Sequence, residues 1–127
     1  MAKPQPRVLL VDDEDEYVSV LSERLILRGL NVYTASRGDE AISLIEEYDI
    51  DVALIDLIMP GISGLELLKH IKTIRPNIQV ILLTGRGSTR EGLEGMRSGA
   101  FDYINKLEDI ESLIARIEAA MHEASNR

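Results

Sequence analysis

Five short runs of β-branched or leucine-rich residues alternate along the chain with five stretches whose apolar residues have helical spacing. The runs are Val8–Val11, Val32–Ala35, Val52–Ile55, Gln79–Leu83 and Asp102–Asn105. Several of these runs are apolar at every position, which is typical of parallel strands that are covered on both faces. Because the two kinds of segment alternate strictly and crossovers are right-handed, the pattern predicts an α/β fold in which helices cover both faces of a parallel sheet.

The stretches between the runs have recognisable helix ends. Ser36 followed by Asp39 predicts a capping pair for the second helix, and Ser63 is expected to cap the third. Gly29 is expected to end the first helix, because glycine readily takes the left-handed conformation that terminates helices. The apolar helical positions are Val18, Leu21 and Leu25, then Ala41, Ile42 and Ile45, then Leu67, Leu68 and Ile71, and finally Ile110, Leu113, Ile114, Ile117 and Met121.

The length of 127 residues is that of one domain, and we expect an ordered core over about residues 7–124 with residues 1–6 as an N-terminal extension. The sequence has no cysteine, no apolar segment like that of a signal peptide, and no apolar run near the ~20 residues that span a bilayer. A cytoplasmic protein without membrane contact is therefore expected. The net charge of −8 argues against direct nucleic-acid binding, which needs clustered Lys and Arg.

Polar side chains that suit a binding site follow four of the five predicted strands. Asp12 and Asp13 follow the first strand, Asp56 the third, Thr84 the fourth and Lys106 the fifth. In an open α/β sheet the binding crevice lies at the carboxyl ends of the strands. We therefore expect three carboxylates, one hydroxyl and one ammonium group at one edge of the sheet.

Each of these residues also has an ordinary structural interpretation when it is considered alone. The acids after the first strand suit a helix N-terminus, and Asp56 can be a turn residue before Met59-Pro60-Gly61. An isolated threonine or lysine carries little information. The convergence of four such signals on one predicted edge favours a shared site.

Clustered carboxylates repel one another unless one is protonated or a cation compensates them. An all-oxygen acidic site with few protein ligands suits Mg²⁺, and Mn²⁺ is an alternative. A carboxylate beside such an ion and a lysine can act as the nucleophile in phosphoryl transfer. Asp56 would then form an aspartyl phosphate, Thr84 would donate a hydrogen bond to a phosphoryl oxygen, and Lys106 would neutralise another.

Four segments in this order resemble the receiver domains of two-component response regulators, over essentially the whole chain. They are Val8-Leu-Leu-Val-Asp-Asp-Glu14, Asp51-Val-Ala-Leu-Ile-Asp-Leu-Ile-Met-Pro-Gly61, Leu83-Thr-Gly85 and Gly99-Ala-Phe-Asp-Tyr-Ile-Asn-Lys106. The resemblance implies a single receiver domain over residues 1–127, similar to the chemotaxis regulators. Its fold would be flavodoxin-like, a doubly wound five-stranded parallel sheet of order 2-1-3-4-5.

The resemblance also implies a phosphoacceptor switch that takes a phosphoryl group from a phosphohistidine of a sensor histidine kinase or a histidine phosphotransfer protein. Asp56 would be the phosphoacceptor. Asp13, Asp56 and the backbone carbonyl of Ile58 would ligate Mg²⁺, and Asp12 would act through a metal-bound water. Apart from its own phosphorylation and dephosphorylation, the chain would catalyse no reaction.

For signalling, the resemblance implies that Thr84 shifts toward the phosphoryl group and that Tyr103 swings inward. This movement would reshape the surface formed by the fourth helix, the fifth strand and the fifth helix, which an unknown downstream protein would bind. The chain would be a monomer or a weak phosphorylation-dependent dimer. The simpler interpretation of Tyr103 is a half-buried strand residue with its hydroxyl in water.

Leu107 follows Lys106 where the family usually has proline with a cis peptide bond before it. Because a cis bond before a residue other than proline costs ~2.5–4 kcal/mol, we predict a trans bond and a different path for this loop.

Gly92 and Gly95 lie in the expected fourth helix, from about Ser88 to Arg97 with Gly99 closing it, where the family commonly has alanine. Each glycine lowers helix stability by roughly 0.8–1 kcal/mol relative to alanine. One hypothesis is an unusually mobile helix, and the other is close packing of this helix on the sheet.

Ile58 and Arg86 flank the expected path of the water that would remove the phosphoryl group. Because the apolar Ile58 cannot orient that water, the sequence predicts slow loss of the phosphoryl group.

Three other functions are alternatives to a stand-alone receiver domain. The chain can be the regulatory part of a longer DNA-binding or enzymatic response regulator. A phosphohydrolase would want a general acid at position 58 and a substrate cap. A flavin-binding module would want a loop rich in Ser, Thr and Gly after the first strand, whereas the acidic loop found here would repel phosphate.

Overall fold

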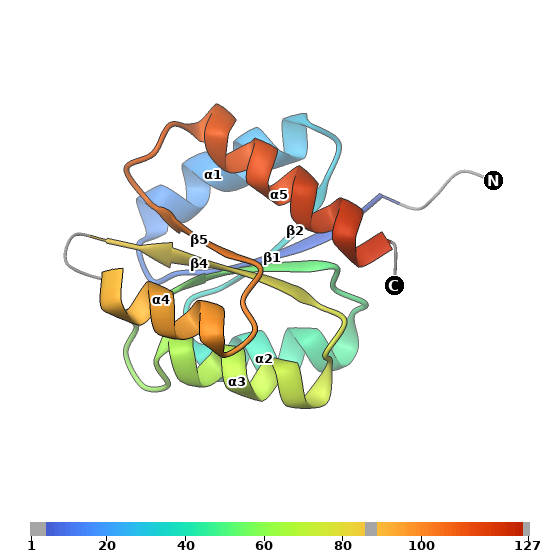
Figure 1. The fold of residues 1–127 in the computed structure, drawn as a ribbon. Helices are drawn as coiled ribbons and strands as arrows, with labels where there is room; N and C mark the ends of the chain where they lie inside the picture. The colour runs from blue at the N-terminus through green and yellow to red at the C-terminus, as the bar shows by residue number, and fades with distance from the viewer. Residues whose placement is uncertain (1–4, 86–88, 126–127) are drawn as a thin grey trace.

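A computed structural model of the chain describes residues 5–85 and 89–125, and within them five strands alternate with five helices (Figure 1). In chain order they are β1 (Arg7–Val11), α1 (Asp15–Leu27), β2 (Asn31–Ala35), α2 (Gly38–Glu47), β3 (Val52–Asp56), α3 (Gly64–Ile74), β4 (Gln79–Thr84), α4 (Thr89–Arg97), β5 (Asp102–Asn105) and α5 (Ile110–Ser125). The predicted start of the fourth helix at Ser88 lies outside the described residues. No helix among the described residues is both long enough and apolar enough to cross a membrane.

The strands form one sheet in the order β2-β1-β3-β4-β5, and every pairing is parallel, which confirms the predicted fold and strand order. Helices α1 and α5 lie on one face of this sheet, and α2, α3 and α4 lie on the other (Figure 1). Because all the strands point the same way, the loops that follow them meet at one edge of the sheet. The polar residues identified in the sequence stand at this edge.

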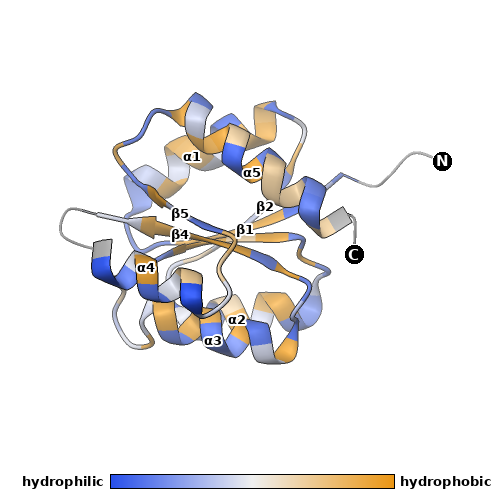
Figure 2. Ribbon diagram, viewed as in Figure 1, coloured by the Kyte–Doolittle hydropathy of each residue, from blue (hydrophilic) through white to orange (hydrophobic). Residues whose placement is uncertain are grey.

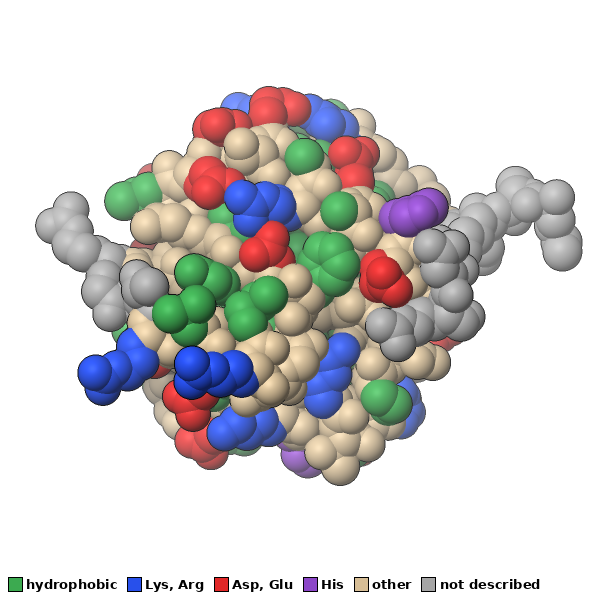
Figure 3. Space-filling model, viewed as in Figure 1, with side chains coloured by type: hydrophobic (Ala, Val, Ile, Leu, Met, Phe, Trp, Pro, Cys, Tyr) green, Lys and Arg blue, Asp and Glu red, His purple; other side chains and the backbone are tan. Residues whose placement is uncertain are grey.

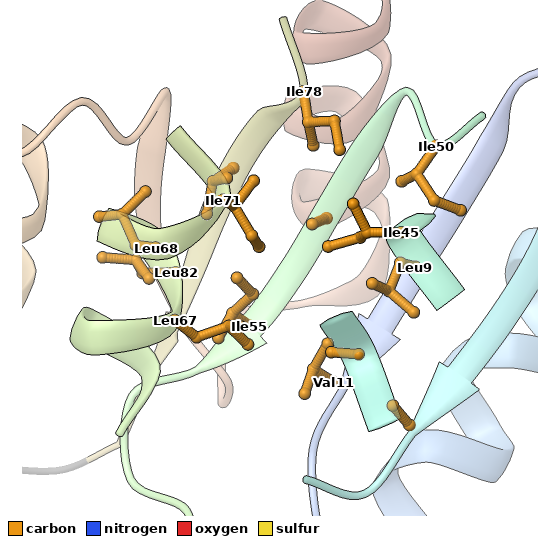
Figure 4. Close-up of a cluster of buried hydrophobic side chains, with 14 of the residues drawn as sticks. Leu9, Val11, Ile45, Ile50, Ile55, Leu67, Leu68, Ile71, Ile78 and Leu82 are labelled. Atoms are coloured by element: carbon orange, nitrogen blue, oxygen red, sulfur yellow. The ribbon is translucent and has the colours of Figure 1, made fainter. Parts of the chain in front are cut away.

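Two apolar clusters hold the helices on the sheet. One lies between the sheet and α2 and α3, where Leu9, Ile45, Leu67 and Ile71 are buried together (Figure 4). The other joins the opposite face of the sheet to α1 and α5. Every residue of β3 is buried, in keeping with the apolar run Val52–Ile55 that precedes Asp56 at its end. The helices carry both hydrophobic and hydrophilic segments, as expected for helices with one buried face (Figure 2).

The helix caps agree with the sequence in one case and differ in another. Ser63 caps α3 as predicted, because its hydroxyl accepts a hydrogen bond from the N–H of Glu66 at 3.2 Å. The predicted pairing of Ser36 with Asp39 is wrong. Helix α2 begins at Gly38, which places Glu40 rather than Asp39 at the third helical position, and the Ser36 hydroxyl donates to Glu40 at 2.6 Å.

Helix α4 lies close to the sheet at its two glycines. A Cβ atom at Gly95 would overlap the side chain of Leu82, and one at Gly92 would lie 2.6 Å from Cδ2 of Tyr103. These contacts support the close-packing hypothesis for the glycines. The outer side of α4 exposes Leu93 and Met96, and Figure 3 shows hydrophobic side chains gathered over this part of the molecule.

Candidate functional site

Three aspartates meet at the carboxyl ends of β1 and β3. Asp12 directly follows β1, and Asp56 is the last residue of β3. The two strands are neighbours, with Val11 opposite Ile55, so the residues that end them are close in space. One carboxylate oxygen from each of Asp12, Asp13 and Asp56 lies within 4.8 Å of the others.

Local hydrogen bonds fix the two buried aspartates. The N–H of Asp12 donates to the carbonyl of Ala35 on β2 at 3.0 Å, and its Oδ1 accepts from the N–H of Glu14 at 2.9 Å. Oδ1 of Asp56 accepts from the N–H of Ile58 at 3.3 Å. Both carboxylates thus shape the turns that follow their strands, and each keeps its Oδ2 atom clear of these backbone contacts.

Gly64 allows α3 to begin directly against the loop that carries Asp56. A Cβ atom at position 64 would overlap the carbonyl oxygen of Asp56 and would lie 2.7 Å from Cα of Leu57. The N–H of Gly64 also donates to the carbonyl of Leu57 at 3.0 Å. The position of Asp56 therefore depends on a residue without a side chain at the start of α3.

Burial makes the negative charge of Asp56 costly. Asp12 and Asp56 are 1% and 7% exposed, whereas Asp13 is exposed. Burial, followed by the charge of Asp12, raises the pKa of Asp56 to about 6, and the Ile58 N–H and Lys106 oppose this rise. A cation at the cluster would favour the ionised carboxylate.

The donor set suits a hard divalent cation. All three candidate ligands offer carboxylate oxygens, and the exposure of Asp13 leaves one side of the cluster accessible to water. Oδ2 of Asp12 is buried, and the ammonium group of Lys106 lies 2.8 Å from it. Mg²⁺ takes oxygen ligands and retains several waters, so these residues fit it.

Lys106 brings a positive charge to the aspartates from the end of β5. Its ammonium group lies 2.8 Å from Oδ2 of Asp12 and 3.8 Å from Oδ2 of Asp56, and it also contacts the carboxylate of Glu14. Burial alone would lower the pKa of Lys106, but its hydrogen bonds to Asp12 and Glu14 outweigh burial and raise that pKa. Lys106 is therefore a permanent cation at the site.

Tyr17, on the first turn of α1, adds an aromatic contact to the same ammonium group. Nζ of Lys106 lies 4.6 Å from the centroid of the Tyr17 ring, within the range of cation–π attraction. Burial raises the pKa of Tyr17 to about 12, with Lys106 opposing the rise, so the phenol is neutral at physiological pH.

The loop after Lys106 is held by Asn105. The N–H of Leu107 donates to the side-chain oxygen of Asn105 at 2.8 Å, and the N–H of Lys106 donates to the carbonyl of Thr84 at 2.9 Å. Proline at position 107 would have no N–H for the first of these bonds. The described residues contain no cis peptide bond, which confirms the trans bond predicted between Lys106 and Leu107.

Thr84 ends β4 beside the aspartates. It follows Leu83, which lies opposite Asp56 in the register of β3 and β4. Thr84 is buried, and its hydroxyl donates to the carbonyl of Ile104 on β5 at 3.3 Å. To donate to a group on Asp56, the hydroxyl would have to leave this carbonyl.

Tyr103 is half-buried on β5, and its ring lies against the backbone of α4 at Gly92. Ile58, on the expected path of the attacking water, is 71% exposed, and Leu107, where the family usually has proline, is 81% exposed. Arg86, the other residue predicted to flank the path of that water, lies outside the described residues.

Sequence reasoning did not identify Tyr17, Asn105 or Gly64 as parts of this site. Tyr17 follows an acidic run and carries no motif of its own. The amide of Asn105 and the missing side chain of Gly64 matter only through contacts that appear on folding. The glycine directly after the capping Ser63 was the one local signal that another part of the backbone lies close to the start of this helix.

The chain is similar to known proteins in both sequence and structure. The family model of the response regulator receiver domain matches residues 8–118. The uncharacterized transcriptional regulatory protein YkoG of Bacillus subtilis is 36% identical over 116 residues, which are 91% of this chain and 51% of that protein. The transcriptional regulatory protein CpxR of Escherichia coli is 38% identical over 115 residues, which are 91% of this chain and 49% of that protein.

Among solved structures, the response regulator receiver domain protein from Clostridium thermocellum superposes with a TM-score of 0.90 at 33% identity. The match covers 94% of this chain and 97% of that one. The chain spans about half the length of the curated relatives named above.

Proposed function

Because this chain belongs to the response regulator receiver domain family of two-component systems, we propose that it is a phosphoacceptor switch whose Asp56 accepts a phosphoryl group from a phosphohistidine in the presence of Mg²⁺. The observation that carries the proposal is the grouping of Asp56 with two other carboxylates, those of Asp12 and Asp13, and with one partly buried lysine beside them. Clustered carboxylates lower the stability of the folded chain, so they indicate a functional site, and this group suits phosphoryl transfer.

In the proposed reaction an oxygen of ionised Asp56 attacks the phosphorus atom of the donor. An O–P bond forms at Asp56 while the P–N bond of the phosphohistidine breaks, and the electron pair of that bond stays on the imidazole nitrogen. The protein must hold the nucleophile in line with the leaving group and balance charge on the phosphoryl oxygens. The Ile58 N–H on Oδ1 fixes the carboxylate and supports Oδ2 as the attacking atom.

Asp13, Asp56 and the backbone carbonyl of Ile58 are the proposed ligands of Mg²⁺, with Asp12 acting through a metal-bound water. When bound, the ion neutralises negative charge on the carboxylates and on the phosphoryl oxygens. Mn²⁺ has the same preference for oxygen and is expected to substitute. The raised pKa of Asp56 and the close grouping of its carboxylate with those of Asp12 and Asp13 support a cation at this position.

Lys106 would neutralise one phosphoryl oxygen, and Thr84 would donate its hydroxyl to another. The Thr84 hydroxyl would leave the Ile104 carbonyl and move toward Asp56. This movement would make room for Tyr103 to turn inward from its place against α4. The α4–β5–α5 surface would change shape as a result. Exposed Leu93 and Met96 on α4 support this surface as the one that a downstream protein binds.

We further propose that the donor is a sensor histidine kinase or a histidine phosphotransfer protein, and that the chain works in the cytoplasm as a monomer or a weak phosphorylation-dependent dimer. Apart from its own phosphorylation and dephosphorylation it would catalyse no reaction, and it would not bind nucleic acid directly. The half-length match to transcriptional regulatory proteins favours a second possibility, that the chain is the regulatory part of such a protein. The complete open reading frame distinguishes the two.

The test is phosphorylation by phosphoramidate, a small phosphodonor, followed by intact-protein mass spectrometry. The wild-type chain is expected to gain one phosphoryl group in Mg²⁺ and none in a chelator. Asp56→Asn should gain none in either condition, whereas Asp51→Asn, at the other end of β3, should behave as wild type. A phosphoryl group that persists in Asp56→Asn, or that does not depend on Mg²⁺, contradicts the proposal.

A further inference from the structure

We propose that Tyr17 is a positioning residue whose aromatic ring holds the ammonium group of Lys106 beside Asp56. The inference rests on the proposed function, because it concerns how the ammonium group of Lys106 is positioned to contact the phosphoryl group during transfer to Asp56. It deepens that proposal by assigning a role to a residue that carries no motif in the sequence.

The geometry joins two residues that are far apart in the chain. Tyr17 lies at the start of α1, and Lys106 follows β5. Nζ of Lys106 lies 4.6 Å from the centroid of the Tyr17 ring and 3.8 Å from Oδ2 of Asp56. The ring therefore contacts the cation at the point where the cation meets the proposed nucleophile.

The ring itself is anchored in the fold. Tyr17 is partly buried and packs against the apolar cluster between the sheet and helices α1 and α5. The Lys106 side chain is only 12% exposed, so water screens its attraction to the ring weakly. The Tyr17 hydroxyl is buried and has no hydrogen-bond partner among the described residues. The contact is thus made by the aromatic ring, and phenylalanine would keep it.

The ring differs from the other groups that hold Lys106. Asp12 and Glu14 attract the ammonium group as anions, and the Glu14 side chain is 63% exposed. A phosphoryl oxygen at Asp56 would compete with both carboxylates for the same cation. Attraction to an aromatic ring needs no acceptor oxygen, so Lys106 could exchange a carboxylate for a phosphoryl oxygen while it stays against Tyr17. Without the ring, Glu14 would hold the ammonium group nearer to solvent.

The test compares Tyr17→Phe with Tyr17→Leu, two apolar replacements of which only the first keeps the ring. Initial rates of phosphorylation are measured over a range of phosphoramidate concentrations at saturating Mg²⁺, and over a range of Mg²⁺ concentrations at saturating phosphoramidate. Tyr17→Leu should lower the maximal rate about five- to tenfold while the half-saturating concentrations of donor and Mg²⁺ stay unchanged. Tyr17→Phe should stay within about twofold of wild type, as should Tyr48→Leu, a control at a distant tyrosine.

A second measurement reports the contact without any phosphoryl transfer. The side-chain protons of Lys106 next to the ammonium group should show an upfield ring-current shift in the wild type and in Tyr17→Phe, and should lose it in Tyr17→Leu. Equal maximal rates for wild type and Tyr17→Leu would overturn the proposal, as would equal slowing in Tyr17→Phe and Tyr17→Leu. Absence of the ring-current shift in the wild type would overturn it as well. If the wild type showed this shift but accepted no phosphoryl group, the proposed function would fail, and with it the role of Tyr17, while the contact itself would stand.

Discussion

The carboxylate half of the site and the lysine half are held by different kinds of contact. Asp12 and Asp56 stand at the ends of two buried neighbouring strands, and backbone N–H groups fix one oxygen of each. Lys106 stands at the start of an exposed loop, and the side chains of Glu14, just before α1, and Tyr17, on its first turn, contact its ammonium group. The nucleophile is therefore placed by the backbone of the fold, whereas the cation is placed by contacts with individual side chains.

The largest expected effect comes from the carboxylate half, through Gly64. A side chain at this position meets backbone atoms of Asp56 and Leu57, which cannot move aside cheaply. Gly64→Ala should therefore lower the free energy of unfolding by about 3 kcal/mol, measured by urea denaturation. Gly85→Ala, whose added Cβ atom meets nothing within 4 Å, should change it by less than about 1 kcal/mol. Equal effects of the two variants would show that the nucleophile is not held by close backbone packing.

The second effect concerns the charge of Asp56. Its pKa is raised to about 6 in the folded state, so the folded chain binds this proton more tightly than the unfolded chain does. The free energy of unfolding should therefore fall as the pH rises from about 4 to about 6, by about 2 to 3 kcal/mol from this group. In a chelator, Asp56→Asn should match the wild type near pH 4 and exceed its stability by this amount at neutral pH.

Denaturation curves of the two proteins at several pH values provide the measurement. Mg²⁺ should stabilise the wild type at neutral pH and have a much smaller effect on Asp56→Asn. If the difference in the free energy of unfolding between the two proteins did not change with pH, the ionised carboxylate of Asp56 would not destabilise the folded chain.

The smallest effect is expected in the lysine half, at Asn105. Asn105→Ala removes the acceptor of the Leu107 N–H, a solvent-exposed hydrogen bond worth about 1 kcal/mol. It should lower stability by no more than that and slow phosphorylation a few-fold through a less fixed Lys106. Asn105→Asp keeps an acceptor oxygen and should behave as wild type in both assays. If Asn105→Asp and Asn105→Ala were impaired equally, the hydrogen bond to Leu107 would not be what holds this loop.

The sequence predicted the carboxylate half better than the lysine half, for a physical reason. Continuous apolar runs identify buried parallel strands, and polar residues at their ends must meet at one edge, so the places of Asp12 and Asp56 follow from local pattern alone. The strand order came from the family resemblance. The boundary of α2 could not be read from Ser36 and Asp39, because capping depends on where the first helical residue stands.

The contacts around Lys106 could not be predicted from the sequence. Lys106 and Glu14 are 92 positions apart, and no local pattern pairs them. The ring of Tyr17 reaches Lys106 only when the first turn of α1 meets the residue that follows β5 in the folded chain. Gly92 and Gly95 allowed two hypotheses, and the overlap of added side chains with Tyr103 and Leu82 supports close packing over the sheet.

The proposed function requires that Asp56 itself receives the phosphoryl group. An aspartyl phosphate is reduced by borohydride to homoserine, which marks the modified residue permanently for peptide sequencing by mass spectrometry. After treatment with phosphoramidate and Mg²⁺, the peptide containing Asp56 should carry homoserine at position 56, and the same peptide treated without Mg²⁺ should not. Homoserine at position 12 or 13 instead, or at no position, would contradict the account.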